Sequence, residues 1–204
     1  MGRPSDARQR LIGAAKEVIY ATSYEAMTVD ELCAAAGVNK SSFYHFFSSK
    51  RELVLVALES QWHSFEQIML KSAFADHLSS QEQIMRFSDL MLQRQQSQKQ
   101  SSGHMRGCPL GNLTLEISTQ DEGIRMQVVR FFQEWFRYFE RMVLQAQAQG
   151  IVPATLDTAA TAQALLACVE GMLLLTKGRN DPALLAPLVT GMLSLMQSQG
   201  VPVG

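Results

Sequence analysis

The chain has 204 residues, of which 47% are hydrophobic and 18% are charged, and its formal net charge is −1. This size and composition exclude a disordered or fibrous protein and suit one or two globular domains with a buried core. The charge is distributed unevenly: residues 1–51 hold seven Lys and Arg against five Asp and Glu, whereas the remainder holds 11 against 14. This small basic excess is compatible with an anionic partner at the N-terminal end but does not establish one.

Three widely spaced cysteines, Cys33, Cys108 and Cys168, do not form a disulfide framework and suit a reducing compartment. The first residues, MGRPSDARQR, lack the apolar stretch of a secretory signal. The longest apolar run, around residues 164–176, is interrupted by Glu170 and is shorter than the roughly 20 residues that span a bilayer. We therefore expect a cytoplasmic protein with no membrane partner.

Helical periodicity dominates the sequence, which predicts an all-α fold of about nine helices. The first helix is expected over residues 5–21, where apolar residues fall on one face at spacings of three and four. Thr28 and Glu31 form a capping-box pattern at the start of the second helix, and Gly37 suits its left-handed end. A third, very short helix is expected to end near Phe47, and a long fourth helix follows it.

The rest of the chain also has a helical pattern. Five further helices are expected, over residues 78–98, from Pro109 onward, over 121–149, over 157–177 and from 181–182 to the C-terminal region. The first of these five ends in QRQQSQKQSSGH, which we interpret as a solvated helix end and loop. Gly178 is expected to close the helix over 157–177, and Pro187 is expected either to kink the last helix or to mark its true start.

The segment GVNKSSFYHFFSSK combines aromatic residues with a polar edge. A helix, a tight turn that contains glycine and a second helix form the plan of a helix-turn-helix. Phe43, Phe46 and Phe47 are expected to pack inward. The opposite, outward face then consists of Lys40, Ser41, Ser42, Tyr44 and His45. Small residues with hydroxyl groups, together with cations, allow a helix to approach a DNA groove and contact phosphates. Two residues at the starts of neighbouring helices are expected to contact the flanking DNA backbone, namely Thr28 and Lys50.

Alternatives remain for several of these side chains. Tyr44 could bury its ring in the core of its own domain, and His45 could cap a helix end. Lys40 and Lys50 could be ordinary solvated charges. Arg3 could reach a minor groove as part of an N-terminal arm or belong to an unbound tail.

The pattern T-V-D-E-L-x-x-x-A-G-V-N-K-S-S-F-Y-H-F-F-S-S-K-R-E-L, within residues 8–53, resembles the DNA-binding signature of the TetR family of bacterial repressors. The resemblance implies an all-helical homodimer with a DNA-binding domain over residues 1–50 and an effector-binding and dimerisation domain over residues 51–204. It implies a repressor that a small-molecule effector releases from a palindromic double-stranded DNA operator. The family's DNA-contact positions fall on Thr28, Lys40, Ser42, Tyr44, His45 and Lys50.

Two positions depart from the family pattern. Ser23 stands where the family often has Gly after the first helix, and Ser41 stands where it often has Gly in the recognition helix. Because Ser41 places a side chain at a position of close approach, it is expected to influence which bases are read.

A second notable segment is HMRGCPLGNL, over residues 104–113. Cys108 directly precedes Pro109 at a predicted helix start, with Arg106 and His104 nearby in sequence. A helix N-terminus and cations favour the reactive thiolate, so one hypothesis is a repressor triggered by covalent modification of Cys108. The GCPLGNL string also resembles, over about ten residues, a branch of the TetR family that includes repressors of detoxifying reductases. The alternative is an inert cysteine packed beside a pocket, as Cys residues usually are.

A ligand cavity is expected among the helices of the body, where bundles usually hold one. Its candidate walls are Phe87, Met91, Cys108, Trp135 and Phe139. Such a stripe of Met and aromatic residues is also compatible with plain core packing. Glu116 and Glu170 lie in apolar surroundings, and each either orients a ligand or reaches the surface at a helix edge.

The patterns of common enzymes are missing from the sequence. It has no Gly-rich phosphate loop, no HExxH, no paired CxxC and no G-x-S-x-G after a strand. Cys108 is the one candidate nucleophile, and His104 is near it in sequence without a convincing third partner. We therefore expect no catalytic residue, no cofactor and no metal site.

Overall fold

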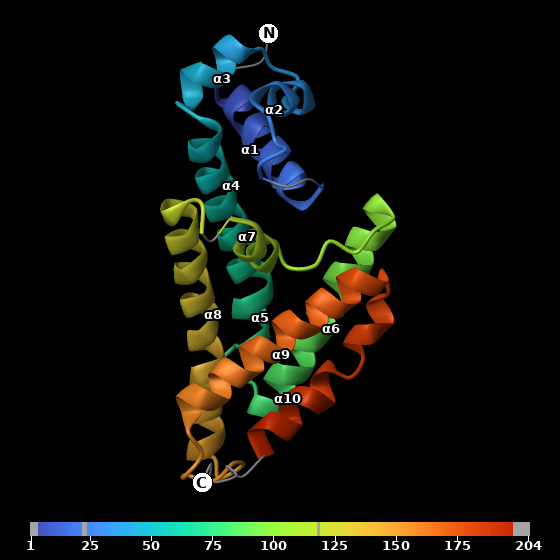
Figure 1. Ribbon diagram of the computed structural model, residues 1–204. Helices are drawn as coiled ribbons and strands as arrows, with labels where there is room; N and C mark the ends of the chain where they lie inside the picture. The colour runs from blue at the N-terminus through green and yellow to red at the C-terminus, as the bar shows by residue number, and fades with distance from the viewer. Residues whose placement is uncertain (1–3, 22–23, 118, 198–204) are drawn as a thin grey trace. The chain divides into compact units, whose positions relative to one another are not determined.

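The computed structural model describes residues 4–21, 24–117 and 119–197. Over these ranges the chain is largely helical and has no strand, which confirms the predicted all-α class. The helices are α1 (Pro4–Ala21), α2 (Val29–Ala36), α3 (Lys40–Phe46), α4 (Lys50–Phe65), a π-helical turn (Glu66–Leu70), α5 (Lys71–Ala73), α6 (Ser80–Ser102), α7 (Pro109–Ile117), α8 (Glu122–Ala148), α9 (Thr158–Arg179), a 3₁₀ turn (Pro182–Leu185) and α10 (Leu188–Gln197) (Figure 1). Because α4, the π-helical turn and α5 follow one another without a break, they count as one helix, and the described total is the predicted nine.

The described residues form two compact units. The first contains the chain up to Phe65 together with Pro109–Val128, and the second contains Glu66–Cys108 and the chain from Val129 onward. Helix α8 therefore contributes its first turns to one unit and the rest of its length to the other. The other boundary falls where α4 changes into the π-helical turn.

The first unit is built around α1, which packs against α2, α3 and α4. The apolar residues that periodicity assigns to the inner face of α1, such as Leu11 and Ala15, are fully buried. Helix α2 begins with the predicted capping box between Thr28 and Glu31. It ends at Gly37, whose φ of 61° lies in the left-handed region that favours glycine, as predicted.

The second unit has an aromatic core between α6 and α8. Phe87 lies with its ring centroid 5.5 Å from that of Phe139 and 6.0 Å from that of Trp135. Phe74, just after α5, packs against the same cluster through tilted and edge-on ring contacts. These separations are typical of aromatic pairs in protein interiors, so the cluster is the main apolar centre of this unit.

The ends of two helices differ from the sequence-based expectation. Helix α6 continues to Ser102, because the Lys99 ammonium donates to the carbonyl of Asn180 and thereby ties the polar tract to the body. Helix α9 ends at Arg179 rather than near Gly178, with Asn180 in the left-handed conformation. The Asn180 side chain accepts from the backbone N–H of Met105 and donates to the carbonyl of Gly103, which explains why Asn rather than Gly ends the helix.

Pro187 marks the true start of the last helix. The chain makes a 3₁₀ turn over Pro182–Leu185, and α10 begins directly after Pro187. The proline thus occupies a place where no helical N–H is needed.

Candidate functional site

The turn between α2 and α3 is held by local hydrogen bonds. Arg10 of α1 donates to the carbonyl of Gly37 at 3.3 Å. The side chain of Asn39 accepts from the backbone N–H of Ser42 at 2.7 Å and so caps α3. These contacts set the direction in which α3 leaves the turn.

Helix α3 has one buried face and one exposed face. Phe43 and Phe47 are 0% and 2% exposed, whereas Tyr44 is 58% exposed. Ser41 and His45 are also exposed. The alternative that Tyr44 buries its ring in the core is therefore wrong for this structure, and Phe43, Phe47, Tyr44, Ser41 and His45 lie on the predicted faces of the helix.

Two residues of α3, Ser42 and Phe46, are neither fully buried nor fully exposed. Phe46, expected inside, is only half-buried, and its ring packs edge-on against that of His45 at 4.7 Å. Ser42, the third residue of α3, is also half-buried, and its backbone N–H is the donor that Asn39 caps.

Lys40 is exposed but has a partner that sequence reasoning missed. Its ammonium lies 2.9 Å from the carboxylate of Asp30 on α2, and this hydrogen bond raises the pKa of Lys40. Asp30 and Lys40 are ten residues apart, so only the fold of the two helices brings them together. A phosphate that approaches Lys40 must compete with this carboxylate.

Lys50 differs from the expectation of an outward-facing charge. Its ammonium donates to the carbonyls of Tyr24 and Met27, at 2.9 and 2.8 Å, and lies 4.5 Å from the centre of the Tyr24 ring. The side chain is half-buried and holds the segment between α1 and α2, because those carbonyls need donors. In this structure Lys50 is a positioning residue for the surface that carries Thr28.

Thr28 is exposed, and its side chain has a structural role. Its hydroxyl accepts from the backbone N–H of Glu31 at 3.2 Å and donates to the Glu31 carboxylate at 2.9 Å. The backbone N–H of Thr28 also donates to that carboxylate, and these bonds lower the pKa of Glu31. Arg3 and Ser23 lie outside the described residues, so the predictions made for them stay predictions.

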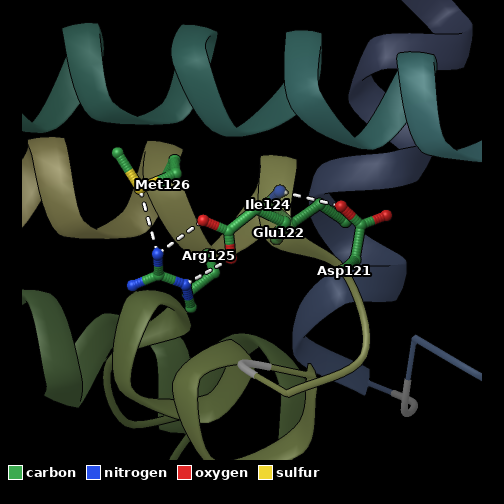
Figure 2. Close-up of polar contacts among 5 residues, drawn as sticks. All are labelled: Asp121, Glu122, Ile124, Arg125 and Met126. Carbon is green, nitrogen blue, oxygen red and sulfur yellow. Dashed lines mark hydrogen bonds and ion pairs between the residues drawn. The ribbon is translucent and has the colours of Figure 1, made fainter.

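The N-terminus of α8 is joined to α4 within the first unit. One carboxylate oxygen of Asp121 caps α8 by accepting from Ile124, and the other accepts from the Arg51 guanidinium at 2.7 Å (Figure 2 shows the capping contact). The bond from Arg51 lowers the pKa of Asp121. A Cβ on Gly123 would overlap the Arg51 guanidinium, so the glycine makes room for this ion pair.

The first turn of α8 is also stabilised by its own side chains. Arg125 donates two hydrogen bonds to Glu122, three residues earlier, and a third to the sulfur of Met126 (Figure 2). Farther along, the side chain of Gln127 donates to the carbonyl of Leu55 on α4 at 3.0 Å. The start of α8 thus has several polar attachments to α4.

Four of the five residues predicted to wall a ligand cavity lie in the aromatic centre of the second unit. Phe87, Met91, Trp135 and Phe139 are each at most 2% exposed and form the aromatic centre of the second unit. This burial supports the alternative of plain core packing for these four residues. None of them lines the hollow that the structure has between two later helices.

That hollow has a volume of about 460 Å³ and lies between α8 and α9 of the second unit. Its walls are mostly apolar, with half-buried phenyl rings on one side. The lining residues are Val129, Phe132, Gln133, Phe136, Gln163, Leu166, Ala167 and Glu170. Sequence reasoning identified Glu170 as a candidate but did not predict Phe132 and Phe136 as walls of a ligand site.

Glu170 is the ionisable group of this hollow. Burial raises the pKa of its carboxyl to about 7, although the hydrogen bond from the Cys108 thiol acts in the opposite direction. Its Oε1 atom is buried and has no hydrogen-bond partner among the described residues. Glu116, the other candidate, lies in the first unit and accepts from the backbone N–H of Glu25.

Cys108 is buried, at 9% exposure, and its hydrogen-bonded neighbour is the Glu170 carboxyl. A sensor thiolate is favoured by cations and by access from solvent. A carboxyl neighbour and burial provide the opposite surroundings, so the structure supports the packing interpretation. Gly107, with φ of 68°, lies close against the Lys177 side chain, which is consistent with close packing of this segment.

The surface of α9 is unusually apolar for an exposed helix face. Among the described residues, α9 is the one helix long and apolar enough to cross a membrane, a test that core helices of soluble proteins also pass. One face carries Leu165, Val169 and Leu173 into the core, but Leu174 and Leu175 are 55% and 62% exposed. The helix is therefore apolar on two sides.

No group of three or more His, Cys, Asp or Glu suited to a metal ion occurs among the described residues.

A helix-turn-helix on a three-helix scaffold, followed by a helical unit with a hollow, defines a helix-turn-helix transcriptional regulator. Comparison with known families agrees. The model of the family described as bacterial regulatory proteins, tetR family, matches residues 11–57, and that of the tetracyclin repressor-like C-terminal domain matches residues 85–192, more than half of the chain. This chain belongs to the TetR family of transcriptional regulators, as its sequence pattern predicted.

Individual relatives extend over most of the chain. The transcriptional regulator AcuR of Cereibacter sphaeroides is 31% identical, covering 89% of this chain and 84% of that protein. The crystal structure of regulatory protein TetR from Rhodobacter sphaeroides is 29% identical, covers 91% of this chain and 96% of that one, and has a TM-score of 0.81. The reduced form of NemR from E. coli shares the fold at 20% identity, with a TM-score of 0.79 over 95% of this chain and 100% of that one.

Proposed function

We propose that the chain is a homodimeric, cytoplasmic repressor that binds a palindromic operator through α3 and leaves it when a small-molecule effector binds the body. The observation that carries the proposal is the division of α3: Phe43, together with Phe47 just after the helix, is buried in the scaffold, whereas Lys40, Ser41, Tyr44 and His45 are exposed. A recognition helix needs one face to hold it and one to read the groove. Regulators of this family normally carry no enzymatic activity, and we expect none here.

The exposed residues are assigned separate roles at the DNA. Tyr44, Ser41 and His45 are proposed to meet base edges and phosphates from α3. Lys40 is proposed to bind a phosphate after leaving Asp30, and Thr28 to contact the backbone from the start of α2. Ser42 and Lys50 are proposed to act nearer the turn, where their contacts position α3 and the start of α2. We propose that residues 1–50 are the DNA-binding domain and residues 51–204 the effector-binding and dimerisation domain, although the compact units of the structure divide the chain after Phe65 and include Pro109–Val128 in the first unit.

The apolar surface of α9 supports the homodimer. Leu174 and Leu175 are exposed on a helix whose neighbour α10 packs beside it (Figure 1). A second copy of the same helix would cover them, because a two-fold interface places the same patch of each subunit against the other. Leu175→Glu should therefore convert the dimer to a monomer in analytical ultracentrifugation. A variant that stays dimeric at all concentrations would remove this support.

Release by an effector requires a path from the body to α3. We infer that α8 provides this path. Residues in the first half of α8 line the hollow, and Asp121, directly before α8, accepts a hydrogen bond from Arg51 of α4. Gly123→Ala should displace the Arg51 guanidinium and weaken the response of DNA binding to effector more than DNA binding itself. A variant with unchanged release would contradict this path.

Binding to DNA is the direct test of the proposed function. DNA selected from a random pool should contain a two-fold repeat, with half-sites about one helical turn apart. Tyr44→Ala should weaken binding to that DNA by about ten- to a hundredfold in fluorescence anisotropy, since a residue that contacts bases is worth roughly 1–3 kcal/mol. Lys71→Ala, on the short helix α5 of the second unit, is the matched surface control and should bind normally. Equal affinity of all three proteins would contradict the assignment of α3.

A further inference from the structure

The hollow between α8 and α9 has a chemical character that points to a class of ligand. Apart from two glutamines and one carboxyl, its lining is apolar. Phe132 and Phe136, four residues apart on α8, are half-buried and contribute to one wall. The opposite wall, on α9, contributes Leu166 and Glu170. A hollow of this kind suits a small molecule with an apolar body and a single polar or charged group.

The Glu170 carboxyl determines which charge that group carries. Oε1 is buried and lacks a hydrogen-bond partner among the described residues, and the other lining residues are uncharged. A buried carboxylate without a counter-charge is unfavourable, so the site gains free energy from a ligand that supplies a positive charge. An anion of the same shape would be repelled by the same carboxylate.

The aromatic wall favours the same ligand. The faces of phenyl rings attract cations, and the attraction increases where water is displaced. Phe132 and Phe136 therefore complement a cationic ligand as well as its apolar body. The glutamines Gln133 and Gln163 add neutral polar groups to the lining but no competing charge.

We propose that this hollow binds a small organic cation with an apolar or aromatic body, with Glu170 as its counter-charge. As an effector site, the hollow rests on the proposed function, since release of DNA is what would make the ligand an effector. Binding of the cation itself does not depend on DNA and can be measured alone.

The probe pair for the test is tetraphenylphosphonium and tetraphenylborate, which have nearly the same shape and opposite charges. Titration calorimetry with the full chain should show binding of the phosphonium and at least tenfold weaker binding of the borate. Glu170→Gln, which keeps the shape of the side chain, should weaken phosphonium binding at least tenfold and bring the two affinities together. Glu140→Gln, on α8 outside the lining, should leave both affinities unchanged.

A second variant locates the site independently of charge. Val129→Trp should fill the hollow and abolish phosphonium binding while the protein keeps its helical circular dichroism and its sedimentation as a dimer. If Val129→Trp instead converts the dimer to a monomer, the hollow belongs to the contact between two copies and the proposal is overturned. Equal affinity for both probes in the unmodified protein, or unchanged phosphonium affinity in Glu170→Gln, would overturn it as well.

DNA binding separates this inference from the proposed function. If phosphonium binds in a Glu170-dependent manner but does not release the selected DNA, the cation site stands and its role as the effector site fails. If the protein binds no specific DNA while the cation still binds, the proposed repressor function fails and the cation site is unaffected.

Discussion

The outward face of α3 and the hollow between α8 and α9 arrange apolar and polar groups in opposite ways. In α3 the rings of Phe43 and Phe47 are inside and the polar groups are in solvent. In the hollow the rings of Phe132 and Phe136 are half-exposed, and the charge-bearing group, Glu170, is largely buried. The first arrangement stabilises the free protein, whereas the second leaves a charge uncompensated until something binds. The proposed DNA surface and the proposed small-molecule site thus differ in where the group without a partner lies.

The largest difference is expected between two phenylalanines. Phe43→Ala removes a fully buried ring from the first unit and should lower the free energy of unfolding by about 3–5 kcal/mol. Phe132→Ala removes a half-buried ring from the hollow and should cost less than half of that, because part of the ring already faces solvent. Urea denaturation of both variants measures the difference. Equal destabilisation would mean that the hollow is closed in solution.

The next largest effect is a dependence of stability on pH. The pKa of Glu170, about 7 in the folded protein, lies above its ordinary value of 4.5, so the folded state holds a proton that the unfolded state has lost between those values. This contribution to stability is present at low pH and is lost as the pH rises from about 4.5 to about 7. Relative to Glu170→Gln, the unmodified protein should lose roughly 2–3 kcal/mol between pH 5 and pH 8.

Thermal or urea unfolding of both proteins across this range is the measurement. Two parallel stability profiles would contradict the buried carboxyl. Addition of tetraphenylphosphonium at pH 8 should restore part of the difference in the unmodified protein only, because the ligand binds its folded, ionised form.

The ion pair of Lys40 with Asp30 on the proposed DNA face gives a third test, with an expected change in DNA affinity of about tenfold. Lys40→Ala should weaken DNA binding and reduce the slope of log Kd against log salt concentration by about 1, because one phosphate contact is lost. Asp30→Asn removes the internal competitor of Lys40, and it should strengthen DNA binding up to about tenfold at low salt. Fluorescence anisotropy over a range of salt concentrations distinguishes the two. Weaker DNA binding by Asp30→Asn would indicate that Asp30 orients Lys40 and does not compete with DNA phosphates for it.

The smallest effect compares two capping boxes. Thr28→Ala at α2 and Ser79→Ala at α6 remove equivalent hydrogen bonds, and each should destabilise the protein by about 1 kcal/mol. If Thr28 contacts the DNA backbone, Thr28→Ala should weaken DNA binding more than its loss of folding stability explains. Ser79→Ala should not weaken DNA binding in this way. Denaturation together with anisotropy tests both. Matched DNA affinities for the two variants would limit Thr28 to its structural role.

Sequence alone predicted much of the first unit because its signals are local. The capping box of Thr28 and Glu31, the glycine turn at Gly37 and the inward phenyl rings of α3 all depend on residues within one or two helical turns of each other. The order and number of helices followed from the same periodicity. The family pattern of the segment up to residue 53 rests on these local signals, so that sequence and fold agree there.

The ligand site could not be located from sequence in the same way. The Met and aromatic stripe that includes Phe87 and Trp135 marks an apolar face, and only packing decides whether such a face encloses space or fills it. Here the rings are buried and pack against one another. The space lies between Phe132 of α8 and Glu170 of α9, 38 positions apart in the sequence. Sequence identified Glu170 as an acidic residue in apolar surroundings but not what it faces.

Lys50 and Cys108 show the same limit for single side chains. The sequence places a lysine at the start of α4 and a thiol before α7, and both positions suit exposed, reactive roles. The fold instead provides two backbone carbonyls for the Lys50 ammonium and a carboxyl for the Cys108 thiol. Residues near in sequence do not reveal such partners, because the partners come from other helices and loops.

The amino-acid sequence by itself determined the helices, their caps, the two faces of α3 and the family of this protein, because each depends on short-range periodicity and local hydrogen bonds. The tertiary structure alone decided which charges meet, as in Lys40 with Asp30 and Arg51 with Asp121, and where the body is hollow. The physical reason is that pairing and burial depend on distances between helices, and those distances are set by the packing of the whole unit.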